Sequence, residues 1–170
     1  MYVFMIEAVA VLVIALAAPE QAPTPIRWSA QPRAPDAAAG GVIMVQVTAE
    51  IDEGWHLYAL DAVEAGPIPT RFSAGPADAF TLQNHDIEKE EPKRALDPNF
   101  SVETAYYEGS ATFGLPIVVA GGVTGGEHRL EVTVRFQACT TRICLRPQTA
   151  TMQLDVEILD PERVISGATR

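Results

Sequence analysis

The feature that most constrains this chain is a strict alternation of apolar and polar side chains along three segments. In residues 43–51, 129–138 and 150–158, every second residue is apolar and most of the intervening residues are polar. Successive side chains of a strand point to opposite faces, so the pattern predicts strands with one buried and one wet face. No window of a dozen residues shows a helical stripe, apart from a short helical turn expected at 160–165. We therefore expect an all-β protein.

Weaker patterns indicate further strands, and glycine and proline supply the turns between them. The turn signals include "EAGPIP", "SAGPADA" and "AGGVTGG". Short antiparallel strands separated in this way are typical of an immunoglobulin-like antiparallel β-sandwich. Residues 84–100 show no alternation and carry many charges, so we predict a long loop there, either simply solvated or functional. The additional strands are predicted at residues 26–30, 55–60, 70–74, 79–83, 102–107 and 113–119.

The amino-terminal residues differ from the rest. An unbroken apolar run, Ala8–Ala18, is too short to cross a bilayer core of about 30 Å as a helix. It ends in Ala15-Leu16-Ala17, which is typical of a signal-peptide cleavage site, although no Lys or Arg precedes it. We predict a signal peptide and hence a periplasmic or secreted protein, with an uncleaved anchor or a misassigned start as alternatives. The predicted division is a signal peptide over 1–18, a strand and linker over 19–40, an immunoglobulin-like redox domain over 41–160 and a tail over 161–170.

The charge balance excludes one class of partner. The chain has 170 residues, is 48% apolar and carries a formal net charge of −10. Its length fits one domain with a sizeable core. Binding to phosphate backbones needs clustered Lys and Arg, so we expect no nucleic-acid partner.

Both cysteines lie in "FQACTTRICLRP", where Cys139 and Cys144 are separated by four residues. Because the strand 129–138 precedes them and the strand 150–158 follows, they are predicted at the tip of a hairpin. A disulfide closing a loop of about six residues contributes roughly 2 kcal/mol, against roughly 4 kcal/mol for a loop near 100 residues. This spacing therefore stabilises poorly, which favours a working redox pair.

Three interpretations of the pair remain open from the residues alone. Arg135, Arg142 and Arg146 surround it, and positive charge favours the thiolate that attacks disulfides. A structural disulfide is the second interpretation. The third is a soft-metal site completed by a histidine, but the histidines show no ligand spacing, so we expect neither a metal nor an organic cofactor. The three histidines are His56, His85 and His128.

The segment "VRFQACTTRICLRPQTATMQLDV" resembles the end of the N-terminal periplasmic domain of the thiol:disulfide interchange protein DsbD family. That family has an aromatic-Gln-small-Cys run, a second Cys, and then a Pro and a Thr before the last strand. Two further segments, "EIDEGWHLYAL" and "PNFSVETAYYEGSATFGLPIVV", are also similar, so the resemblance covers about residues 25–160. It implies an immunoglobulin-like fold with a redox pair at one end.

The resemblance also implies roles. Cys144 would form mixed disulfides with partners and Cys139 would resolve them, as part of a protein-disulfide reductase system. Phe100 would belong to a cap loop over the pair, and His56 and Tyr58 would take the places of the family's aromatics beside it. The alternatives are a surface strand residue for His56, a core aromatic for Tyr58 and a loop anchor for Phe100. We expect Arg142 and Pro147 to complete the surroundings of the pair.

The implied partners are periplasmic thioredoxin-like proteins or a membrane electron transporter, reached through transient mixed disulfides. The family's membrane and thioredoxin-like domains are not found in these 170 residues, so electrons are expected to come from a separate protein. The alternative function is a non-catalytic β-sandwich binding module with a structural hairpin disulfide.

Overall fold

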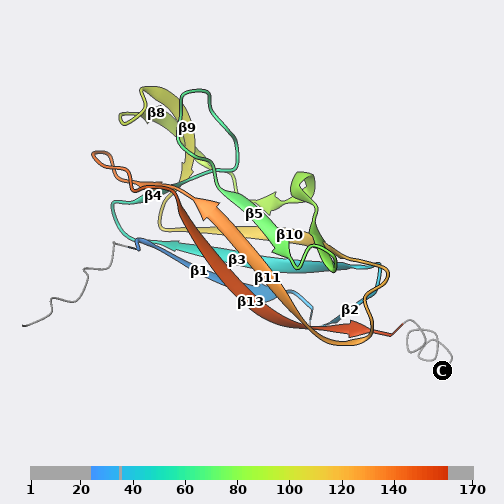
Figure 1. The fold of residues 1–170 in the computed structure, drawn as a ribbon. Coiled ribbons are helices and arrows are strands. Elements are labelled where there is room, and N and C mark those ends of the chain that lie inside the picture. The colour runs from blue at the N-terminus through green and yellow to red at the C-terminus, as the bar shows by residue number, and fades with distance from the viewer. Residues whose placement is uncertain (1–23, 35, 161–170) are drawn as a thin grey trace, which may run out of the picture.

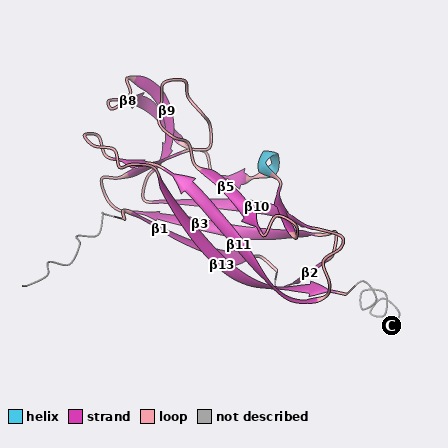
Figure 2. Ribbon diagram, in the orientation of Figure 1, coloured by secondary structure: helices cyan, strands magenta, loops and turns pink. Residues whose placement is uncertain are grey.

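The computed structural model of the chain describes residues 24–34 and 36–160. Two sheets pack face to face, and a smaller third sheet projects from one end (Figure 1). Among the described residues, the one helical element is a 3-10 turn, η1 (Asn84–Asp86), drawn in cyan in Figure 2. The predicted all-β, immunoglobulin-like sandwich is confirmed. The predicted signal peptide, the helical turn after residue 160 and the tail lie outside the described residues.

The strands are antiparallel throughout the described part, except that β2 pairs with β13 in parallel. The first sheet has the order β1 (Ile26–Pro32), β3 (Val42–Ile51), β10 (Ser110–Val119) and β6 (Phe80–Leu82), with β7 (Glu88–Lys89) also paired to β10. The second has the order β2 (Asp36–Ala38), β13 (Gln148–Leu159), β11 (Gly126–Phe136) and β5 (Arg71–Gly75). The third has the order β12 (Ala138–Cys139), β4 (His56–Tyr58), β9 (Val102–Tyr107) and β8 (Lys93–Asp97).

The core lies between the first two sheets, where the alternating apolar side chains meet. An aromatic cluster joins the layers at the end that carries the cysteines. Trp28 of β1 contacts Phe136 of β11 at 5.3 Å between ring centroids and Phe72 of β5 at 5.9 Å, and Phe72 contacts Phe113 of β10 at 5.0 Å. Such tilted and edge-to-face pairs add to the stabilisation from buried area. Because Phe136 ends β11, the core fixes the base of the cysteine hairpin.

The prediction of a loop over residues 84–100 is wrong. This segment contains η1, β7 and β8, and β8 forms a hairpin with β9 in which Lys93 pairs with Tyr106 and Asp97 with Val102. Four of the five β8 residues are exposed and only Asp97 is buried. A strand with water on both faces needs no apolar alternation, which is why the pattern did not reveal it.

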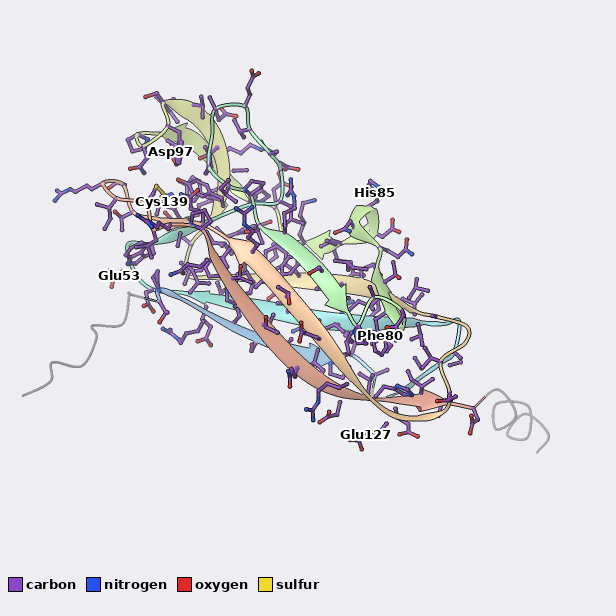
Figure 3. The ribbon with its side chains drawn as sticks, viewed as in Figure 1. Glu53, Phe80, His85, Asp97, Glu127 and Cys139 are labelled. Atoms are coloured by element: carbon purple, nitrogen blue, oxygen red, sulfur yellow. A yellow bond between two sulfur atoms is a disulfide. The ribbon has the colours of Figure 1, made fainter. Side chains whose placement is uncertain are left out.

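Within the described residues, no helix is both long enough and apolar enough to span a membrane. The two ends of the molecule differ in the residues that they carry. Cys139 and Asp97 lie at one end, and Glu127 lies at the other (Figure 3). The β8–β9 hairpin projects from the cysteine end (Figure 1).

Candidate redox site

Cys139 and Cys144 form a disulfide, with an S–S distance of 1.98 Å and a Cα–Cα distance of 4.1 Å. They face each other across an antiparallel bridge. The backbone hydrogen bonds lie on either side of the pair: the Thr140 N–H donates to Ile143 O at 2.8 Å, and the Leu145 N–H to Ala138 O at 3.0 Å. This is the non-hydrogen-bonded position of a ladder, where opposed side chains come closest. The backbone therefore holds the two sulfurs together independently of their bond.

The two cysteines differ in exposure. Cys139 is 0% exposed, whereas Cys144 is half-buried. The hairpin tip beyond them is in solvent, and the Thr140 hydroxyl accepts hydrogen bonds from the backbone N–H groups of Arg142 and Ile143, each at 3.1 Å. Of the two residues, Cys144 is therefore the more exposed.

Gln137 anchors the hairpin to the sandwich. Its Oε1 accepts a hydrogen bond from the Ile68 N–H at 2.9 Å, and its Nε2 donates to Leu145 O at 3.1 Å. Both bonds satisfy groups near the core, so Gln137 ties the strand after Cys144 to the segment before β5. Sequence reasoning noted Gln137 as a part of the cysteine motif and, from the alternation, expected it to face solvent, but the side chain is buried.

The short strand β12 places the pair in the third sheet. Cys139 lies opposite His56, and Ala138 opposite Leu57. Directly opposed residues in an antiparallel pair project to the same face, with Cβ atoms about 4.5–5.5 Å apart. His56 is 8% exposed, which rules out the alternative of a surface strand residue. The register therefore places His56 and Cys139 side by side on one face of the third sheet.

A chain of buried polar groups leads from His56 to the β8–β9 hairpin. Nε2 of His56 lies 3.1 Å from the Tyr58 hydroxyl, which donates to Oδ2 of Asp97 at 2.6 Å. Asp97 also accepts hydrogen bonds from the Thr104 hydroxyl at 3.4 Å and from the Asn99 backbone N–H at 2.8 Å. Tyr58 is 1% and Asp97 4% exposed, so these hydrogen bonds replace water.

The network fixes protonation states. Burial acts to raise the pKa of Asp97, but hydrogen bonds from Tyr58 and from the Asn99 backbone outweigh it and hold that pKa below its ordinary value. Burial and the hydrogen bond to Asp97 raise the pKa of Tyr58. Burial lowers the pKa of His56, although the negative charges of Asp97 and Glu108 act to raise it. Near neutral pH the site therefore holds a carboxylate, a phenol and a neutral imidazole.

Residues 98–101, which connect β8 and β9 and are here called the cap turn, lie against both the network and the hairpin. Phe100 is half-buried, and its ring meets that of Tyr58 edge-on at 6.0 Å between centroids. The Asn99 side-chain amide donates to Thr140 O, beside Cys139, at 2.9 Å. The cap turn is thus attached to the cysteine hairpin by the Asn99–Thr140 hydrogen bond, and to the buried network by the Phe100–Tyr58 contact and the Asn99 backbone bond to Asp97.

The remaining predicted site residues lie in solvent. Arg142 is at the hairpin tip, Pro147 directly precedes β13, and both are exposed, as is Arg146. A cavity of about 120 Å³ beside the pair is lined by residues that include His56, Asp97 and Thr141. In the part of the chain that the structure describes, no three His, Cys, Asp or Glu residues are grouped as metal ligands, and His85 lies far from Cys139 (Figure 3).

Sequence reasoning missed Asp97, Asn99 and Thr104. The run Asp97-Pro98-Asn99 is a turn signal, because aspartate accepts hydrogen bonds from the backbone two residues on and proline cannot continue a strand ladder. That signal could have placed a tight turn just before Phe100. It gives no indication that the carboxylate also reaches Tyr58.

Solved structures resemble this chain. The N-terminal periplasmic domain of ScsB from Proteus mirabilis matches with a TM-score of 0.56 and 15% identity, over 89% of this chain and 54% of that one. This chain therefore spans about half of that structure. The reduced N-terminal domain of DsbD from Neisseria meningitidis matches with a TM-score of 0.48 and 17% identity, over 71% of this chain and 80% of that one. At 15% identity, the likeness to the ScsB domain shows the fold alone.

A comparison with curated proteins found no significant match. The family model described as "Thiol:disulfide interchange protein DsbD, N-terminal" matches residues 26–156, which reach every strand of the sandwich and include both cysteines. The chain therefore belongs to the DsbD N-terminal domain family.

Proposed function

We propose that this protein is a periplasmic thiol–disulfide exchange domain that passes reducing equivalents to disulfides of partner proteins through Cys139 and Cys144. The observation that supports this most strongly is the asymmetry of the pair. Cys144 is half-buried beside a hairpin turn, while Cys139 is fully buried directly opposite it. An attacking sulfur needs access, and a resolving sulfur needs only to reach the first.

The exchange balances without a cofactor. In the reduced domain, the Cys144 thiolate attacks a partner disulfide, forms a mixed disulfide and releases one partner thiolate. The Cys139 thiolate then attacks Cys144 Sγ, which forms the Cys139–Cys144 bond and releases the second partner thiolate. Two electrons pass to the partner, and a separate reductant restores the dithiol. Because the ladder holds the two cysteines opposed, the second step needs little backbone movement.

The surroundings supply a way to control access and a surface for docking. Opening the cap turn requires loss of the exposed Asn99–Thr140 hydrogen bond and of the Phe100–Tyr58 contact. Two apolar side chains at this end are exposed to an unusual degree, Leu96 on β8 at 73% and Ile143 at the hairpin tip at 56%. They suit the apolar surface around the active site of a thioredoxin-like partner or of a membrane electron transporter.

The proposed compartment is the periplasm, since a disulfide persists in an oxidising environment. We assign the signal peptide to residues 1–18 and the tail to 161–170, and we propose that the exchange domain takes in β1 and β2 of the predicted strand and linker as well as residues 41–160, because both strands pair within the sandwich. Arg142 and Pro147 are proposed to border the partner's disulfide, where the guanidinium stabilises the thiolate of Cys144.

A trapping experiment tests the proposal. In Cys139→Ala the resolving sulfur is missing, so the mixed disulfide with a partner should accumulate when the reduced variant is incubated with a periplasmic extract. Non-reducing electrophoresis and mass spectrometry would locate the bond at Cys144. Cys144→Ala is the matched control and should trap no partner. Equal trapping by both variants, or by neither, would contradict the assigned roles.

A redox titration separates exchange from a structural disulfide in a binding module. Structural disulfides of secreted proteins have reduction potentials below about −300 mV. We expect the Cys139–Cys144 bond to be reduced at a higher potential, measured by equilibration with glutathione and thioredoxin couples. A potential below that limit would support the structural alternative.

A further inference from the structure

The resolving step requires that Cys139 lose its proton, and water is not placed to take it. The side chain is 0% exposed, beneath the hairpin and next to the buried network. A neighbouring group must accept the proton if resolution is to be fast. His56, directly opposite Cys139 in the β12–β4 pairing, is the one titratable side chain in that position.

The hydrogen bonds determine which nitrogen of His56 is available. Tyr58 has one hydroxyl hydrogen, and at 2.6 Å it is donated to the ionised Asp97. The Tyr58 oxygen can then only accept from His56, so Nε2 of the imidazole carries the hydrogen. In a neutral ring the lone pair consequently lies on Nδ1. The described residues provide no hydrogen bond to that nitrogen.

We propose that His56 accepts the thiol proton of Cys139 at Nδ1 during resolution of the mixed disulfide, and that Tyr58 and Asp97 are positioning residues that fix its tautomer. The inference rests on the proposed exchange function. The proton passes from Cys139 Sγ to Nδ1, the resulting thiolate forms the bond to Cys144, and the partner sulfur leaves with the electron pair. The imidazolium then returns its proton to solvent or to the departing thiolate.

The charges around His56 suit this role. Asp97 lies 3.7 Å from Nε2, and Glu108 lines the same cavity, so both carboxylates stabilise the imidazolium while it exists. Burial favours the neutral ring before and after the step. The titratable groups that face the imidazole are Tyr58 on β4, Asp97 on β8, Tyr106 and Glu108 on or beside β9, and Cys139 on β12.

The test uses dithiobis(nitrobenzoate), an aromatic disulfide, with the fully reduced protein in a stopped-flow spectrometer. The first equivalent of thionitrobenzoate reports attack by Cys144, and the second reports resolution by Cys139. In His56→Gln the amide still donates to Tyr58 but offers no base. We expect the second phase to slow by at least roughly tenfold near pH 7, with the first phase changed by less than about twofold.

The pH dependence of the second-phase rate distinguishes a proton acceptor from a purely structural residue, because a structural role of His56 would leave that dependence unchanged. In His56→Gln the second phase should rise about tenfold per pH unit, because Cys139 must ionise unaided, whereas the wild-type rate should level off above the pKa of His56. Tyr58→Phe keeps the base but removes the hydroxyl that fixes the tautomer of His56. The second phase should therefore have a rate between those of wild type and His56→Gln. His85→Gln, on the exposed turn η1, is the matched control and should behave as wild type.

The outcomes are distinguishable. If His56→Gln resolves at the wild-type rate with the wild-type pH profile, the inference is overturned while the exchange function stands. If the wild-type protein releases no thionitrobenzoate from Cys144, the proposed function itself fails. A denaturation midpoint of oxidised His56→Gln close to that of wild type shows that a slower second phase is not caused by unfolding.

Discussion

At the scale of single residues, Asp97 connects the cap to the redox site. It begins the turn through the Asn99 backbone, and it accepts the Tyr58 hydroxyl that orders His56. The Asp97 carboxylate therefore stabilises both the conformation of the cap turn and the tautomer of His56. Loss of such a group is costly, since a buried donor left without an acceptor costs about 1–3 kcal/mol.

Asp97→Ala is expected to lower the free energy of unfolding by about 2–4 kcal/mol, because Tyr58 and Thr104 both lose a buried acceptor. Urea denaturation of the oxidised variant would measure this. Asp86→Ala, at an exposed position of η1, is the control and should change stability by less than about 0.5 kcal/mol. A loss below about 1 kcal/mol for Asp97→Ala would mean that the network does not hold the site.

The lowered pKa of His56 gives stability a definite dependence on pH. When the pH falls below the ordinary pKa of histidine, the unfolded chain binds a proton at this position that the folded protein does not bind. Stability should therefore decline from pH 7.5 towards pH 5, and His56→Gln should reduce that slope. Thermal melts across the range would show it, with His85→Gln retaining the wild-type slope. If the stability of His56→Gln changes with pH as steeply as that of wild type, a group other than His56 causes the pH dependence.

At the scale of elements, the sequence predicted the long half-buried strands and missed the exposed strand β8 and the two-residue strand β12. The alternation in β3, β11 and β13 identified the sandwich, because one face of each strand must meet the core. The pattern could not reveal β8, which is wet on both faces, or the two-residue pairing of β12 with β4 that sets Cys139 beside His56. The hydrogen bond between Tyr58 and Asp97 joins residues 39 apart along the chain, a distance at which periodicity carries no information.

The cap turn is expected to limit access to the disulfide. Asn99→Ala removes the hydrogen bond to Thr140 and leaves the Asn99 backbone bond to Asp97 in place. The variant should be reduced several-fold faster than wild type by a bulky phosphine. Its stability should fall by only about 0.5–1.5 kcal/mol, as for one partly exposed hydrogen bond. Asn84→Ala in η1 is the control, and reduction of both variants at the wild-type rate would exclude a role for this hydrogen bond in gating.

At the scale of the whole molecule, the sandwich is a rigid support with its chemistry at one end. The cysteine segment and two further segments indicated the family, and the match over residues 26–156 confirms that resemblance. The cysteine segment could not show how the disulfide end of the sandwich is built. There, Gln137 hydrogen-bonds the hairpin to the segment before β5, and the aromatic cluster fixes the base of the hairpin. The strand β8 adds an exposed apolar side chain, Leu96, at the same end.

Partner exchange should depend on the exposed apolar residues of this end. Leu96→Asp and Ile143→Asp are each expected to weaken association with a thioredoxin-like partner by about 1 kcal/mol or more, because the partner would desolvate an unpaired charge. Steady-state disulfide transfer would measure the effect. Val42→Asp is the matched control, since Val42 is 53% exposed but lies at the other end of β3. Equal loss in all three variants would argue for a general effect of charge.

The long strand β13 has a practical consequence. It begins at Gln148, next to the disulfide hairpin, and runs for 12 residues to Leu159. At about 3.3 Å per residue, the strand separates those two positions by roughly 36 Å. A surface anchor or reporter joined directly at residue 160 would therefore lie at the end remote from the sulfurs, and the tethered protein would leave its disulfide open to incoming proteins.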